Sequence, residues 1–118
     1  MSLNRKVQVL AVLLLIAVGP TWAHAILLAA TPSANQVVAG GNVDVRLRFN
    51  SRIDAKRSRL VILGPDGRER PLAIDEQPSP DVLTAKPEPL IPGSYVLRWQ
   101  VLAEDGHITR GEVPFTAH

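Results

Sequence analysis

Apolar and polar residues alternate with a period of two over much of the chain after residue 24. In segment 43–49 the apolar residues are separated by Asp44 and two arginines, and segment 95–101 repeats the pattern from Tyr95 to Val101. Alternation of this kind predicts strands with one buried face. Shorter apolar or branched runs between turn residues predict further strands at 25–30, 59–63, 72–74, 82–85 and 113–116.

The predicted strands imply the fold class. Seven short strands with no sustained helical periodicity favour a single all-β domain, an antiparallel sandwich of immunoglobulin-like topology. The turn signal at 64–67 predicts a hairpin between 59–63 and 72–74. Pro114 predicts an edge position or a bulge in the last strand. Segment 71–92 is rich in proline and is expected to be an irregular connection with one short strand inside it.

The first 23 residues have the composition of a secretory signal. Arg5 and Lys6 form a basic head, an apolar run covers 7–18, and the small residue Ala23 ends the segment. The apolar run is well short of the ~20 residues that cross a bilayer. We therefore expect export and cleavage after Ala23, which leaves 24–118 as one mature domain without a membrane span. The alternative is an uncleaved N-terminal anchor.

Composition narrows the possible partners. The chain has 13 Lys+Arg against 11 Asp+Glu, and loss of Arg5 and Lys6 with the signal removes this excess of positive charge. The most basic stretch, 52–59, has no aromatic residue for base stacking, so nucleic acid is not indicated and a solvated loop or strand face is the simpler interpretation. The chain has no cysteine. An exported domain of this size must then be stabilised by its apolar core or by a metal.

The histidines are the candidate metal ligands. Cleavage after Ala23 would make His24 the first residue, so its ring and its α-amine could bind one ion together. The amine has a reference pKa of about 8, and a metal displaces its proton readily near neutral pH. Asp105 and His107 would share one face of an extended segment, and Gly106 allows the backbone to bend. Two nitrogens from His24, one from His107 and an oxygen from Asp105 would form a tetragonal set, typical of copper(II) or nickel(II), with copper(II) bound more tightly.

Each of these features also has a simpler interpretation. Asp105 could belong to a plain turn and His107 could be an ordinary residue at a strand end. The metal site requires a fold that brings the N-terminus beside the loop 103–110. His118 is the last residue and is expected to be a frayed terminus without a metal role. Trp99 is expected to lie in the core, where nearby copper(II) could quench its fluorescence.

Several segments of the chain form a recognisable set. They are His24-Ala25 before a strand and Thr31-Pro32, then Leu47-Arg48-Phe49, then 92–99, and Asp105-Gly106-His107 with Gly111 and Phe115. Over essentially all of 24–118 this set resembles the CopC family of periplasmic copper-binding proteins. The resemblance implies a seven-stranded Greek-key sandwich or barrel, similar in shape to a cupredoxin. It also implies a copper(II) site held by His24, Asp105 and His107, a periplasmic location, and an inner-membrane copper importer of the CopD type as partner.

Two departures from the family pattern limit the predicted site. Some members have a glutamate shortly after the Leu-x-Phe segment, whereas this chain has Asn50, Ser51 and Arg52 there. Some members have a methionine-rich loop for copper(I), whereas the methionine here is Met1, which leaves with the signal. Without methionine or cysteine the mature chain lacks the soft ligands that select copper(I). We therefore expect one copper(II) per chain. Whether His118 or a residue near Ser51 adds a ligand is left open by the sequence.

Three function classes remain at this point. The leading interpretation is a protein that sequesters or delivers copper(II) in the periplasm and is not an enzyme. The second is a copper enzyme that cleaves polysaccharides oxidatively through an N-terminal histidine, although the aromatic content of 4% is low for a flat sugar-binding surface. The third is an immunoglobulin-like module that makes protein contacts and binds no metal.

Overall fold

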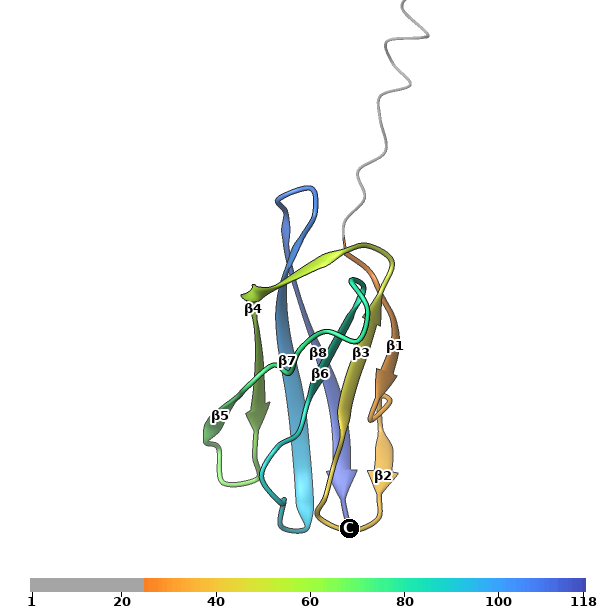
Figure 1. Ribbon diagram of the computed structural model, residues 1–118. Coiled ribbons are helices and arrows are strands. Elements are labelled where there is room, and N and C mark those ends of the chain that lie inside the picture. The colour runs from red at the N-terminus through yellow and green to blue at the C-terminus, as the bar shows by residue number, and fades with distance from the viewer. Residues whose placement is uncertain (1–24) are drawn as a thin grey trace, which may run out of the picture.

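Two β-sheets packed face to face form the described part of the protein, residues 25–118 of a computed structural model (Figure 1). One sheet has the strand order β1-β3-β6, and the other has the order β2-β8-β7-β4-β5. The strands are β1 (Leu27–Thr31), β2 (Gln36–Val38), β3 (Val45–Phe49), β4 (Ile53–Leu63), β5 (Glu69–Leu72), β6 (Val82–Ala85), β7 (Gly93–Ala103) and β8 (Ile108–Ala117). Within residues 25–118 there is no helix long and apolar enough to cross a membrane. The predicted signal, its cleavage site and His24 lie outside the described residues.

The predicted all-β sandwich is confirmed, with one strand more than expected. The added strand, β2, is three residues long and mostly exposed, and it pairs in parallel with the end of β8, from Gln36 opposite Phe115. The other described pairings are antiparallel. Three residues, two of them exposed, are too few to give a periodic signal, and the sequence therefore does not reveal this strand.

The strongest predicted strands follow their pattern closely. Strand β3 buries Val45, Leu47 and Phe49 and exposes the two arginines between them. Strand β7 buries every second residue from Tyr95 to Ala103. Both strands therefore turn one apolar face towards the space between the sheets, where burial of apolar surface is the main stabilising term.

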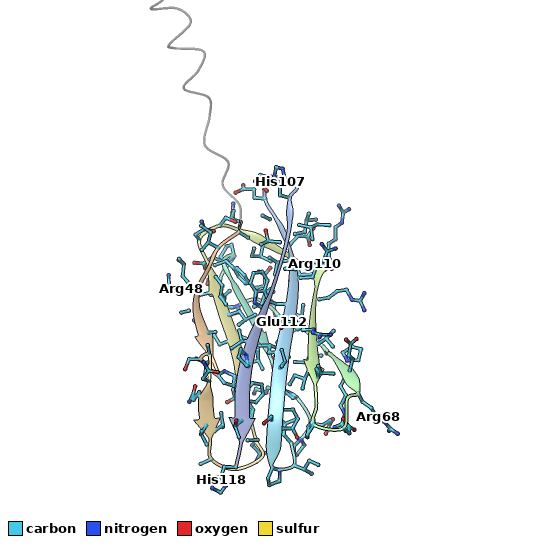
Figure 2. All side chains as sticks on the ribbon, turned by 180° about the vertical axis from the view of Figure 1, so that it is seen from behind. Arg48, Arg68, His107, Arg110, Glu112 and His118 are labelled. Carbon is cyan, nitrogen blue, oxygen red and sulfur yellow. The ribbon has the colours of Figure 1, made fainter. Side chains whose placement is uncertain are left out.

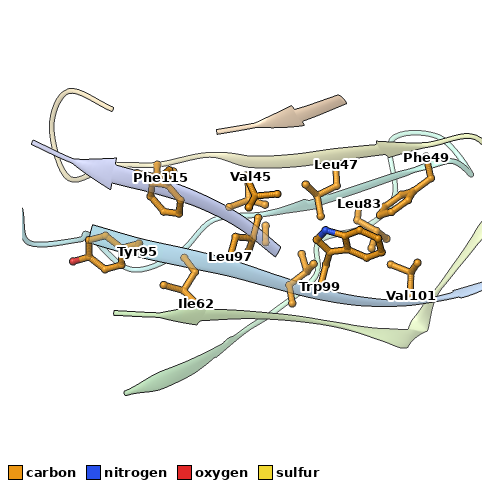
Figure 3. Packing of buried hydrophobic residues seen from close by; sticks show 14 of the residues in the cluster. Val45, Leu47, Phe49, Ile62, Leu83, Tyr95, Leu97, Trp99, Val101 and Phe115 are labelled. Carbon is orange, nitrogen blue, oxygen red and sulfur yellow. The ribbon is translucent and has the colours of Figure 1, made fainter. Parts of the chain in front are cut away.

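Two aromatic pairs occupy opposite ends of this core (Figure 3). The rings of Phe49 and Trp99 meet edge to face, with centroids 5.2 Å apart. The rings of Tyr95 and Phe115 stack, with centroids 5.6 Å apart. The Tyr95 hydroxyl donates a hydrogen bond of 2.6 Å to the carbonyl of Ile91, four residues upstream. This arrangement is like the tyrosine corner of immunoglobulin-type sandwiches.

The last strand is longer than predicted, and its length positions the candidate site. Strand β8 begins at Ile108, not at residue 113, and pairs with β7 along its whole length from Ile108 opposite Leu102. Pro114 lies on the side of β8 that faces β2, where its carbonyl accepts a hydrogen bond from the Asn35 nitrogen. The missing N–H of Pro114 is therefore not needed by the ladder with β7. As a result, β7 and β8 form one long hairpin, and residues 104–107 make its turn.

Candidate metal centre

The hairpin turn 104–107 is closed by backbone hydrogen bonds. The Ala103 nitrogen donates to the carbonyl of His107 over 2.9 Å, and the Gly106 nitrogen donates to the carbonyl of Ala103 over 2.9 Å. Gly106 has a φ of 86°, in the left-handed region that glycine adopts at little cost, and no atom lies within 4 Å of where a Cβ would be. The glycine is therefore required by backbone conformation, not by space, as the sequence predicted.

Within this turn Asp105 contacts His107 twice. One carboxylate oxygen, Oδ1, accepts a hydrogen bond of 3.0 Å from the His107 backbone nitrogen, and the other, Oδ2, lies 3.0 Å from the ring nitrogen Nδ1. The side chain of Asp105 is 26% exposed and that of His107 is 44% exposed. The two predicted ligands are thus adjacent and partly open to solvent at the end of the molecule. They meet through a tight turn, whereas the sequence suggested an extended segment that places both on one face.

The beginning of the described chain lies at the same end of the sandwich. The coloured ribbon begins at the end of the sandwich where the β7–β8 hairpin turns (Figure 1). Ala25 is buried in the core, and Ile26 follows it just before β1. The Asn50 side chain accepts a hydrogen bond of 2.7 Å from the Ile26 nitrogen. The carbonyl of Arg52 accepts a hydrogen bond of 3.0 Å from the nitrogen of Glu104, the first residue of the hairpin turn. Loop 50–52, between β3 and β4, therefore contacts both the start of the described chain and the hairpin turn.

The third histidine lies far from this end. His107 and His118 are at opposite ends of the sandwich (Figure 2). The expectation that His118 is frayed is wrong for its backbone, since its nitrogen donates to the carbonyl of Val38 over 2.9 Å and its carbonyl accepts from the nitrogen of Gly40 over 3.1 Å. Its side chain is exposed. A shared metal site with His107 is therefore ruled out by distance along the molecule.

Trp99 lies in the core, as predicted. It is 8% exposed and faces Phe49 across the gap between the sheets. Its cross-strand partner on β8 is Gly111, and a Cβ on that glycine would lie 2.2 Å from Cζ2 of the indole. The indole thus occupies the space that a side chain at position 111 would fill. Trp99 and Gly111 lie on β7 and β8, the two strands that the hairpin turn connects.

Beside loop 50–52, the Asp81 carboxylate lies near the positive charges of Arg48 and Arg46. Asp81 has its pKa lowered from 3.8, first by a hydrogen bond from the Ser79 hydroxyl and further by the positive charges of Arg48 and Arg46. The Ser79 Oγ to Asp81 Oδ1 distance is 2.7 Å. The carbonyl of Asp81 also accepts a hydrogen bond of 2.9 Å from the Phe49 nitrogen. Segment 79–81 is therefore hydrogen-bonded to Phe49, the residue that precedes loop 50–52.

The geometry can now be set beside known proteins. A sequence profile described as the CopC domain matches residues 27–118. This chain belongs to the CopC family. Protein YobA of Escherichia coli K12 is 32% identical over 98 residues, which cover 80% of this chain and 79% of YobA.

Two solved structures share the fold. The crystal structure of CopC from Methylosinus trichosporium OB3b superposes with a TM-score of 0.72 at 35% identity, covering 80% of this chain and 93% of that one. PcoC, a methionine-rich copper resistance protein from Escherichia coli, superposes with a TM-score of 0.66 at 27% identity, covering 81% of this chain and the whole of PcoC. The family and fold expected from the sequence are therefore confirmed. In contrast to methionine-rich PcoC, this CopC chain has the single methionine Met1.

One residue of the site region was not anticipated. The sequence marked Asn50 only as a place where some CopC proteins have a nearby carboxylate. The structure shows that its side chain holds the backbone of Ile26, which lies 24 positions earlier. An asparagine just after a strand commonly marks a turn, and the sequence has no signal that would have indicated this long-range contact.

Proposed function

We propose that this CopC protein is exported, is cleaved after Ala23, and binds one copper(II) ion in the periplasm. The ligands are the α-amine and ring of His24, a ring nitrogen of His107 and a carboxylate oxygen of Asp105. The protein sequesters the ion or delivers it to a partner, for which an inner-membrane importer of the CopD type is the candidate. This makes copper the cargo of the protein and not a catalytic cofactor.

The observation that carries the proposal is the pairing of Asp105 with His107 at the end of the sandwich where the described chain begins. The Asp105 Oδ2 to His107 Nδ1 distance is 3.0 Å, and the turn that holds them is bonded through Glu104 to loop 50–52. The same loop holds Ile26, two residues after His24. The proposal therefore assigns the donors of His24, the residue joined to Ala25, to this end of the molecule, and a nitrogen-rich set with one oxygen suits copper(II).

The donor chemistry also favours copper(II) over copper(I). Copper(I) prefers thiolate and thioether ligands. The chain has no cysteine, and its methionine, Met1, lies within the predicted signal. Imidazole, amine and carboxylate are the donors that remain, and they match the higher oxidation state.

The position of the aromatic side chains favours a copper carrier over an enzyme that cleaves polysaccharides oxidatively. Enzymes that act on polysaccharides present aromatic rings to the sugar on an open face. In residues 25–118 the aromatic residues are Phe49, Tyr95, Trp99 and Phe115, and all of them are buried, with exposures between 1% and 8%. The described surface therefore offers no aromatic platform for a sugar chain.

Export and calorimetry test the proposal together. The protein is expressed with residues 1–23, the exported form is recovered, and its N-terminus is determined by mass spectrometry. Titration of that form with copper(II) is expected to give one equivalent bound per chain. A mature chain that starts at a residue other than His24 would contradict the proposed ligand set, and absence of copper(II) binding would favour the protein-contact module.

A further inference from the structure

Asn50 makes two hydrogen bonds to a single residue near the start of the domain. Its side-chain Oδ1 accepts from the Ile26 nitrogen over 2.7 Å, and its backbone nitrogen donates to the Ile26 carbonyl over 3.0 Å. Pairing of β1 with β3 begins one residue later, at Leu27 opposite Phe49, and its register shifts between Leu27 and Ala29. At Ile26 the amide side chain thus takes the place of a strand carbonyl, and both backbone polar groups of Ile26 are satisfied by one residue.

Asn50 itself belongs to a segment that is fixed on both sides. The Phe49 nitrogen donates to the Asp81 carbonyl over 2.9 Å, and the Ile53 nitrogen donates to the Pro80 carbonyl over 2.9 Å. The Gln77 side-chain amide donates to the Ile53 carbonyl over 3.2 Å. The loop between these anchors has little freedom, so a residue held by Asn50 is held relative to the whole sandwich.

The same loop is bonded to the hairpin turn that carries Asp105 and His107. The Glu104 nitrogen donates to the Arg52 carbonyl over 3.0 Å, two residues after Asn50. Loop 50–52 therefore sets the spacing between the Ile26 backbone and the hairpin turn. Ala25 lies between Ile26 and His24, and its burial in the core leaves it little room to move.

From these contacts we infer that Asn50 is the positioning residue for the N-terminal metal chelate, acting through Ile26 and not by touching the ion. The inference rests on the proposed function, in which His24 supplies two donors. Ordering a free chain terminus costs conformational entropy, and a ligand that binds a terminus already fixed does not meet that cost. Because Asn50 holds Ile26 before any metal binds, part of the ordering of the N-terminal segment is already present in the metal-free protein.

The expected loss of copper(II) affinity is taken from the net free energy of one hydrogen bond. Removing the Asn50 amide in an Asn50→Ala protein should weaken copper(II) binding by roughly five- to ten-fold. The loss should be confined to a chain whose first residue is His24. In a form with one extra glycine before His24, the α-amine no longer belongs to that residue and the chelate of amine and ring on one residue is lost, so the position of Ile26 should matter less.

The test is a double-mutant cycle on copper(II) affinity. Four proteins are compared by competition against a chelator: the mature chain and the glycine-extended chain, each with Asn50 or with Asn50→Ala. Gln36→Ala in the mature chain is the matched control. Gln36 makes the same pair of bonds to Ser33, with its Oε1 accepting from the Ser33 nitrogen over 2.9 Å and its own nitrogen donating to the Ser33 carbonyl over 3.0 Å. It begins β2, which pairs with the end of β8 remote from the hairpin turn.

The outcomes separate this inference from the proposed function. The inference predicts a five- to ten-fold loss for Asn50→Ala in the mature chain, less than about a two-fold loss in the extended chain, and unchanged affinity for Gln36→Ala. Equal losses in the mature and extended chains, or no loss in either, would overturn the role of Asn50 while leaving the copper site in place. A mature chain that binds no copper(II) would instead remove the proposed function, and this inference with it.

Discussion

Replacing Gly111 with alanine should destabilise the fold through a clash with a buried ring. A Cβ at this position would lie 2.2 Å from Cζ2, 2.5 Å from Cε2 and 2.9 Å from Nε1 of Trp99. Cβ atoms essentially never come closer than 3.0 Å to such atoms, so the indole must move by about 0.8 Å or more, or the two strands must separate. The indole cannot move freely, because Trp99 is 8% exposed and its ring meets the ring of Phe49 in a T-shaped arrangement.

Overpacking of a core of this kind costs about 1–3 kcal/mol, and the short distances favour the upper half of that range. For a domain of this length each kcal/mol lowers the melting temperature by roughly 4–8 °C. We therefore expect Gly111→Ala to lower the melting temperature of the metal-free domain by about 10 °C or more in a circular dichroism melt.

A second substitution distinguishes the clash from other effects of losing glycine. In the double variant Gly111→Ala with Trp99→Phe, the smaller ring leaves room for the new methyl group. Its destabilisation should therefore be less than the sum of the two single variants, by about 0.5–3 kcal/mol. A Gly111→Ala protein that melts at the wild-type temperature, or strictly additive effects, would contradict the packing described for this strand pair.

Three further predictions concern the site and its surroundings. In copper(II) titrations His107→Ala should weaken binding by more than roughly 100-fold. Asp105→Ala should weaken binding less, and His118→Ala should leave it unchanged. Unaltered copper(II) affinity in the His107→Ala protein would show that the hairpin turn does not belong to the site. Copper(II) at roughly 1,000-fold excess over Kd should stabilise the fold by about 4 kcal/mol and raise its melting temperature by at least several degrees. An unchanged melting temperature would argue against a copper(II) site that exists only in the folded protein. The pKa of Asp81 is lowered from 3.8, so the contribution of this carboxylate to folding stability is present above pH 3.8 and is lost as the pH falls through the lowered pKa. Ser79→Ala should raise the pKa of Asp81 in an NMR carboxyl titration. An unchanged pKa would contradict the hydrogen bond from Ser79 as the main cause of the lowering.

Strands with a clear period of two were predictable from sequence, and others were not. Strands β3 and β7 show the alternation that one buried face produces. The first half of β8 does not, because residues 108–112 contain one large apolar residue, Ile108, and a glycine that lies beneath Trp99. Its strand character comes from pairing with β7, which a local pattern does not record.

The candidate site was predictable in part. Asp105 and His107 could be proposed because aspartate, glycine and histidine in succession combine two metal donors with a residue that permits a tight turn, and the structure brings the two side chains together. Asn50 could not be proposed, because its partner Ile26 is 24 residues away and the contact depends on how β1 and β3 pair. His24 lies outside the described residues and stays a prediction.

The most direct test of the central claim is a comparison of two N-termini. In the precursor the nitrogen of His24 belongs to the amide with Ala23, and amide resonance leaves it no lone pair for a metal at neutral pH. Only cleavage after Ala23 frees the amine, so the site should form only in the exported chain. The mature protein and a form with one extra residue before His24 are titrated with copper(II) against a competing chelator, after circular dichroism has established that both are folded. The account predicts far weaker binding by the extended form, whereas equal affinities would show that the amine is not a ligand and that the terminal position of His24 is incidental.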